Sequence, residues 1–150
     1  MAVQVRASFK LTGWNANQLK LRVPQILGTY QTVLDRQLKE EIQSPQFEWI
    51  KTGPNGEPWF TKRRNGQTVG SPRDIVDLGG FLRSQRRRFD GRSTITFSWD
   101  VPYANLILQG YTTSKSTLVP GRNWIKPALE NAPLDAYFAE QWRKLSGISL

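Results

Sequence analysis

A long stretch of apolar residues at helical spacing constrains the fold of this chain more than any other feature. Between Leu19 and Ile42 the apolar side chains recur every three or four residues, which places them on one face of a helix. Pro24 interrupts the stretch, because it lacks a backbone donor and disfavours helical geometry at Val23. The pattern predicts either a kinked helix or a short helix followed by a longer one.

Two further segments alternate between apolar and polar residues, which is typical of half-buried strands. The first covers residues 3–11 and is a candidate for a sheet edge. The second covers residues 92–99, where Ile95, Phe97 and Trp99 fall on one face. Each segment predicts a strand with one face in the core.

The remaining segments are shorter. Aromatic residues on both sides of a Gly-Pro-Asn-Gly turn at 53–56 predict a hairpin or loop pair, and we expect the chain to be flexible from there to residue 70. Proline and glycine delimit a short helix over 102–110, and residues 120–133 are expected to be irregular around a buried tryptophan. Residues 134–145 predict a short amphipathic helix.

This order of elements is typical of a single α+β domain spanning residues 1–150. We expect a mostly antiparallel sheet with a long N-terminal helix and a short C-terminal helix packed on it. No apolar run approaches the roughly 18 residues of a membrane span. The alternating N-terminus also differs from the apolar block of a signal peptide, so we expect no membrane association.

The chain contains neither histidine nor cysteine. Disulfides, thiolate or histidine metal sites, and Ser–His or Cys–His nucleophile pairs are therefore excluded. An enzyme would depend on carboxylates, lysine or tyrosine, and the 12 acidic residues are scattered apart from the adjacent Glu40 and Glu41. We expect no enzymatic activity, no metal and no cofactor.

Positive charge is concentrated in one part of the sequence. The net charge is +9, and residues 62–92 contain nine basic and three acidic residues, which is six of those nine charges. Such a segment suits contact with a polyanion or an acidic protein surface. A solvated, solubilising face is the alternative.

The stretch SPRDIVDLGGFLRSQRRRF, residues 71–89, holds five of these nine basic residues. Asp77 is placed to cap a helix over residues 78–85, a role that we favour over catalysis. Gly79 and Gly80 are costly inside a helix, which predicts that another backbone approaches there. On such a helix Arg83, Arg86 and Arg87 would project outward together.

This stretch resembles the Asp-Thr-Gly-x-Leu-x-x-Ser signature of the tail-completion, or neck, protein family of tailed bacteriophages. Two further motifs of that family, Tyr-Ala…Glu-Phe-Gly and Arg-Pro-Phe-x-x-Pro-Ala, have counterparts in PYANLILQG and GRNWIKPALE. The chain departs from the family at Leu78, Gln109 and Asn123, where threonine, an acidic residue and proline are usual. The residues that carry the likeness are Asp77, Gly79, Leu82, Ser84, Tyr103, Ala104, Gly110, Arg122, Trp124, Pro127 and Ala128.

The resemblance implies a structural virion protein, made in the cytoplasm of the bacterial host and located at the head–tail interface. Its members form a homo-oligomeric ring in the neck, for which we expect six or twelve subunits. The ring joins the connector or stopper proteins to the tail-terminator protein around the channel that the genome passes through. Non-specific contact with that DNA is part of the expectation.

Candidate interface residues follow from the charge and the exposed elements. The segment 53–70 and the N-terminal strand could dock neighbours, the latter by strand addition. A basic nucleic-acid-binding module is the alternative function, with Trp49 and Trp59 as a base-stacking platform. For Arg86, Arg87 and Arg88, a solvated face or an inter-subunit ion pair is the alternative to DNA contact. Arg122 could form an ion pair as readily as it could contact a ligand. The candidates for the channel or interface are Lys62, Arg63, Arg64, Arg83, Arg86, Arg87 and Arg88.

Overall fold

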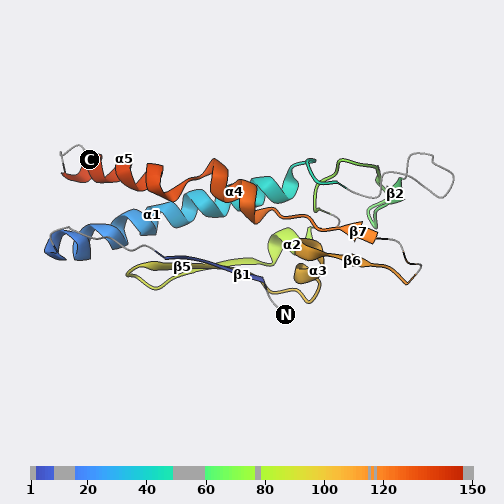
Figure 1. Cartoon of the computed structure of the whole chain (residues 1–150), viewed down its shortest axis with the longest axis horizontal. Coiled ribbons are helices and arrows are strands. Elements are labelled where there is room, and N and C mark those ends of the chain that lie inside the picture. Colours follow the sequence, from blue (N-terminus) through green and yellow to red (C-terminus); the bar gives the residue numbers. More distant parts are fainter. Residues whose placement is uncertain are drawn as a thin grey trace.

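The computed structural model describes residues 3–8, 16–48, 60–76, 79–114, 116 and 118–146. It confirms the α+β class, with three small antiparallel sheets in place of one larger sheet. Figure 1 shows the long helix α1 (Ala16–Gln43) between the main sheet and the C-terminal helices. The expectations for Asp77 and for the aromatic turn with Trp49 and Trp59 lie outside the described residues.

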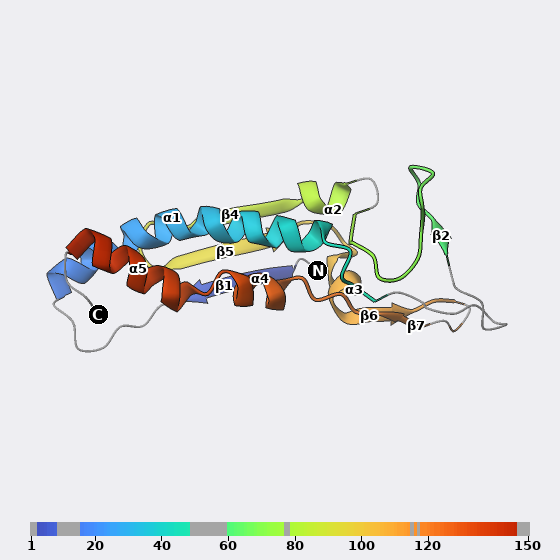
Figure 2. The same cartoon turned by 90° about the horizontal axis from the view of Figure 1, so that it is seen from above.

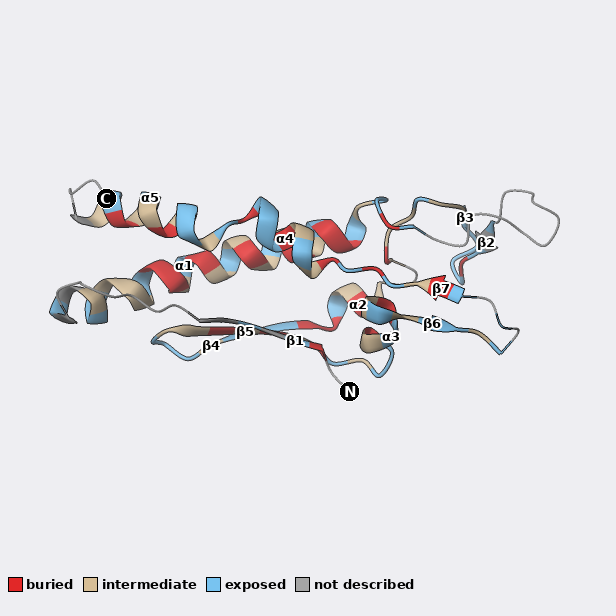
Figure 3. Cartoon of the chain, viewed as in Figure 1, coloured by how far each residue is buried: buried red, intermediate tan, exposed pale blue. Residues whose placement is uncertain are grey.

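Helix α1 runs without a break through Pro24, so of the two alternatives the chain forms one helix and not a short helix followed by a longer one. Six of its large side chains are almost completely buried. Figure 3 shows the buried residues in red at intervals along the helix ribbon. Burial of each contributes about 1.5–3 kcal/mol, which outweighs the roughly 3 kcal/mol cost of a proline inside a helix. These six are Ile26, Leu27, Tyr30, Leu34, Leu38 and Ile42.

The main sheet has the strand order β1–β5–β4 and is antiparallel throughout. Strand β1 (Val3–Ser8) and strand β4 (Gln85–Phe89) form its two edges, and Figure 2 shows them on either side of β5 (Thr94–Trp99). Both predicted strands and the predicted edge are thus confirmed. Ile95, Phe97 and Trp99 of β5 are buried, as their alternation predicts.

The helix expected over residues 78–85 is instead a single turn, α2 (Gly80–Arg83), followed at once by β4. The Ser84 hydroxyl closes the turn by donating to the Phe81 carbonyl over 2.7 Å. Gln85 then pairs with Trp99 in the sheet. Residues 85–89 form a strand because they pair with β5. The spacing of residues within this stretch does not reveal that partner.

Two small hairpins lie near each other at one end of the molecule (Figure 1). Strands β2 (Thr61–Lys62) and β3 (Thr68–Val69) meet across a turn at Gly66, whose backbone N–H donates to the Arg63 carbonyl over 2.9 Å. Strands β2 and β3 thus form a hairpin within the segment 53–70, where a flexible hairpin or docking loop was expected. The second hairpin pairs β6 (Gly110–Thr112) with β7 (Leu118–Pro120), which the sequence did not predict.

The C-terminal part is more helical than expected. Helix α3 (Ala104–Gln109) and helix α5 (Leu134–Ser146) match their predictions, but residues expected to be irregular form α4 (Ile125–Asn131). The Asn123 side-chain oxygen accepts hydrogen bonds from the N–H groups of Ile125 and Lys126, both over 3.1 Å, and so supports the start of α4. Helices α4 and α5 pack on α1 instead of directly on the sheet.

Candidate functional site

The three motif segments meet in one aromatic cluster, although Phe81 and Trp124 lie 43 positions apart in sequence. The Phe81 ring lies 4.9 Å from that of Trp124 and 6.4 Å from that of Tyr103, between ring centroids. Trp99 of β5 completes the cluster, 5.1 Å from Trp124. Edge-on and tilted contacts of this kind stabilise a core beyond the area that they bury. The cluster therefore fixes α2, α3 and the start of α4 relative to each other.

In the first motif segment, the residue that anchors the chain in the core differs from the one predicted. Phe81 is buried and Leu82 only partly, so Phe81 is the main anchor and takes the position of the leucine in the signature. Gly79 has a φ of 75°, in the left-handed region that favours glycine. The expected close backbone approach is absent there, since a Cβ on Gly80 would come no nearer than 3.5 Å to the Tyr103 hydroxyl. The signature glycine therefore serves a turn.

Close backbone approach occurs elsewhere, at Gly110 and Gly121. A Cβ on Gly110 would lie 2.6 Å from the backbone nitrogen of Gly121, and one on Gly121 would lie 2.6 Å from the Leu108 carbonyl oxygen. Only glycine fits both places. The pair brings the end of α3 against the chain that leads to Arg122, whose N–H donates to the Ile107 carbonyl over 2.8 Å.

A basic cleft of about 750 Å³ opens beside this cluster, and we call it the arginine cleft. Its cations come from the β2–β3 hairpin, the segment before α2, α2 itself and the segment before α4. Among the described residues that line it there is no aspartate or glutamate. The six cationic residues are Lys62, Arg63, Arg64, Arg73, Arg83 and Arg122. Five of these were singled out from the sequence, and Arg73 was not, since nothing in its local spacing connects it to Arg122.

Two of these guanidinium groups are held inside the protein. Arg63 is buried, pairs with the Asp74 carboxylate and donates to the Gln67 side-chain oxygen over 3.1 Å. Arg122 is also buried, and burial together with the nearby charge of Arg73 lowers its pKa to about 10. Burial therefore disfavours the charged form of Arg122, and the nearby Asp74 carboxylate acts in the opposite direction.

Apolar side chains form the rest of the cleft wall. Phe81 and Ile107 are buried, whereas Tyr103, Leu106 and Tyr111 are 42%, 47% and 37% exposed. The cleft therefore offers cations and apolar surface side by side. A site of this size and mixed lining suits a small ligand or a few residues of a peptide.

A second basic surface lies on the outer face of the main sheet. Side chains alternate along a strand, so Arg86 and Arg88 of β4 share the outer face with Arg6 of β1. Neither edge strand nor β5 contains an acidic residue. We call these three arginines the outer sheet face.

Arg87 points to the opposite side of the sheet. Its guanidinium lies 4.0 Å from the Asp35 carboxylate of α1 and donates to the Thr32 hydroxyl over 3.2 Å. The expectation that the arginines of this stretch form one helical face is therefore wrong. Arg83 lies at the cleft, Arg86 and Arg88 on the outer sheet face, and Arg87 against α1.

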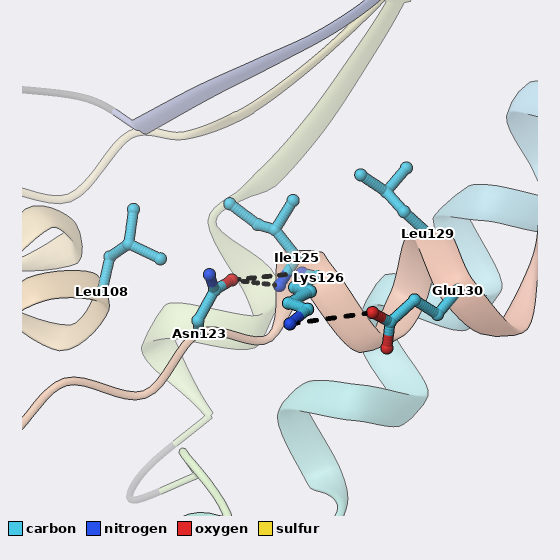
Figure 4. Close-up of a pocket in the computed structure, with 6 residues that line it drawn as sticks. All are labelled: Leu108, Asn123, Ile125, Lys126, Leu129 and Glu130. Carbon is cyan, nitrogen blue, oxygen red and sulfur yellow. Dashed lines mark hydrogen bonds and ion pairs between the residues drawn. The ribbon is translucent and has the colours of Figure 1, made fainter.

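A smaller recess of about 430 Å³ lies between α3 and α4 (Figure 4). Leu108, Ile125 and Leu129 supply its apolar lining. Its charged pair, Lys126 and Glu130, is exposed, with 3.9 Å between the ammonium nitrogen and the carboxylate oxygen. The recess thus presents apolar surface, and its charged groups offer no arrangement suited to catalysis.

The adjacent acids Glu40 and Glu41 have separate surroundings. Glu40 is exposed, 3.7 Å from the Arg36 side chain. Glu41 is buried and accepts hydrogen bonds from Gln37, Gln46 and Asn131. They do not form an acid–base pair, and Glu41 instead ties α1 to the following loop and to α4.

Neither a metal-ligand cluster nor a membrane span occurs in the described part of the chain. Its residues contain no group of three or more potential metal ligands. Within the same ranges no helix combines the length and the apolar character needed to cross a membrane. Comparison of the chain with protein-family models, with curated proteins and with solved structures finds no match.

Proposed function

We propose that this chain is a structural protein of the neck of a tailed bacteriophage, a subunit of a ring that joins the head connector to the tail around the DNA channel. One observation carries the proposal. The three segments that resemble the neck family pack into a single aromatic cluster around Phe81 and Trp124. Motif residues that share a core form a coherent structural unit, as a scaffold without catalytic chemistry requires.

Two features of the main sheet support assembly around DNA. Among the described residues, the edge strands β1 and β4 each pair with a strand on one side only, and such edges can pair with a neighbouring subunit. The outer sheet face presents Arg6, Arg86 and Arg88 without a neighbouring acid on its strands. In a ring, copies of this face would contact phosphates without reading bases.

Light scattering on the purified chain over a range of concentrations, with and without double-stranded DNA, tests this function. A discrete species of six or twelve times the 17.2 kDa chain mass without DNA would support the ring. Electron microscopy of that species should show a ring with a central hole. A chain that stays monomeric, alone and when mixed with connector and tail components, would refute the proposal.

A basic nucleic-acid-binding module is the second candidate, and the outer sheet face favours it. It requires that the monomer binds free DNA or RNA tightly and that salt releases it steeply. The neck proposal requires weak binding by the monomer, because its arginines act as an array. A salt titration of monomer binding therefore separates the two functions.

A further inference from the structure

We propose that the arginine cleft is a docking site for a short acidic segment of a different protein, with carboxylates on its guanidinium groups and an apolar side chain against its wall. The inference rests on the cleft alone, and it stands whether or not the chain belongs to a phage neck. The outer sheet face takes no part in it.

The first argument is charge. Six cationic residues line the cleft, and no aspartate or glutamate is among the described residues that line it. Gathering like charges around one hollow costs free energy. Besides burial, which is the larger cause, the nearby charge of Arg73 lowers the pKa of Arg122. A natural protein that keeps such a cluster gains from it when an anion binds.

The second argument concerns the type of anion. Guanidinium groups form paired hydrogen bonds with carboxylates and phosphates alike. The apolar wall favours a peptide, because the half-exposed Leu106 beside Phe81 and Ile107 gives an apolar side chain a surface to pack against. Tyr103 already packs against Phe81. Arginine and tyrosine around a concave site, with Arg63 and Arg122 held in place by burial, match the anchors of protein interfaces.

The third argument disfavours other occupants of the cleft. A second copy has 21 basic and 12 acidic residues, so most of its charged side chains would repel those of the cleft. Duplex DNA presents a convex row of phosphates, which suits an open surface such as the outer sheet face better than a recess. The complement in charge and shape is an acidic peptide segment.

The test uses a fluorescent 12-residue peptide that alternates glutamate with leucine and tyrosine, and a 12-residue oligothymidylate as the nucleic-acid probe. Binding to the full chain is measured by fluorescence anisotropy in 100 mM salt. The cleft variant carries Arg64→Glu and Arg83→Glu, both at exposed side chains. The control carries Arg86→Glu and Arg88→Glu on the outer sheet face, which changes the net charge by the same amount. Circular dichroism confirms that both variants fold.

We expect the peptide to bind the wild-type chain, to lose at least tenfold in affinity for the cleft variant, and to keep its affinity for the control within about threefold. A peptide in which lysine replaces glutamate should not bind. Equal losses in both variants would show binding by net charge and overturn the proposal. So would no peptide binding up to about 1 mM, or oligothymidylate that binds more tightly and displaces the peptide from the cleft.

Discussion

At the scale of single residues, Tyr30 connects the long helix to the junction of the two C-terminal helices. Its buried hydroxyl donates to the Ala132 carbonyl over 2.6 Å, at the point where α4 ends before Pro133. An unpaired carbonyl at this buried place would cost about 1–3 kcal/mol. We expect Tyr30→Phe to lower the free energy of unfolding by that amount, measured by urea denaturation. Tyr137→Phe is the control, because its hydroxyl bonds Thr29 in an exposed place, and an equal loss there would contradict the assignment.

The same hydroxyl gives a pH dependence. Burial, with a smaller contribution from Asp135, raises the pKa of Tyr30 to about 12 from the ordinary value of 10.0. A raised pKa means that the folded state favours the protonated hydroxyl, so its contribution is complete below pH 10 and is lost between pH 10 and 12. The stability difference between wild type and Tyr30→Phe should therefore shrink across that window. A difference that stays constant to pH 12 would show that the hydroxyl is not buried as described.

Glu41 gives a similar prediction for acidic pH, as Tyr30 does for alkaline pH. Burial alone would raise its pKa, but hydrogen bonds from Gln46, Asn131 and Gln37 outweigh burial and lower it. We expect Glu41→Gln to cost about 1–3 kcal/mol at neutral pH, since an amide cannot accept all three bonds. The depressed pKa means that this contribution is present above the ordinary glutamate pKa and is lost as the pH falls through the folded value.

Urea denaturation at a series of pH values checks this prediction for Glu41→Gln. The gap between wild type and variant should narrow below about pH 4.3, the ordinary pKa of a glutamate. Glu40→Gln serves as the matched control, because its carboxylate is exposed and its pair with Arg36 contributes little. If Glu40→Gln proves as costly as Glu41→Gln, the three-way hydrogen-bonded position of Glu41 is not what stabilises the fold.

At the scale of elements, the Gly110–Gly121 contact holds the β6–β7 hairpin to the end of α3. We expect Gly121→Ala to cost more than about 1 kcal/mol, because its Cβ would meet backbone atoms of Leu108 and Gln109 that have no free rotation. Gly28→Ala is the control, in helix α1 with only an ordinary 3.7 Å contact to Phe89, and it should be neutral or stabilise by up to about 1 kcal/mol. Thermal denaturation of both variants measures the change in stability. A Gly121→Ala variant as stable as the wild type would rule out the close backbone approach.

Elements with a strong pattern of their own were predictable from the sequence. The spacing of Leu34, Leu38 and Ile42 indicated α1, and the alternation of Ile95, Phe97 and Trp99 indicated β5. Those patterns arise because each element turns one face to the core. The segment 85–89 was misjudged, since its strand character comes from pairing with β5 and not from its own residues.

The candidate site was predictable only in part, and for a related reason. Composition identified the basic residues between 62 and 92, and the motif resemblance singled out Arg122. Their division between two surfaces depends on the fold, because the turn at Ser84 and the alternation of β4 send Arg83, Arg86 and Arg87 in three directions. Local spacing carries no information about which distant segments enclose a cleft.

At the scale of the whole molecule, the two basic surfaces should bind different partners. The outer sheet face is open and polar, as a row of phosphates requires, while the arginine cleft is concave and partly apolar. We therefore expect the double substitution Arg86→Glu and Arg88→Glu to weaken the binding of the protein to a 20-base-pair DNA duplex. Binding is measured on the oligomeric state that light scattering identifies. Each phosphate that the variant no longer neutralises should reduce the slope of log affinity against log salt by about 0.9.

The cleft variant, Arg64→Glu with Arg83→Glu, completes this comparison, since it removes the same number of positive charges from the chain. Its affinity for the duplex should fall much less, and its salt slope should change little, because duplex phosphates do not enter the recess. Taken with the peptide measurement, each pair of substitutions then removes one kind of binding and spares the other. Equal weakening of duplex binding by both pairs would mean that DNA responds to net charge alone, and the outer sheet face would lose its proposed role in the channel.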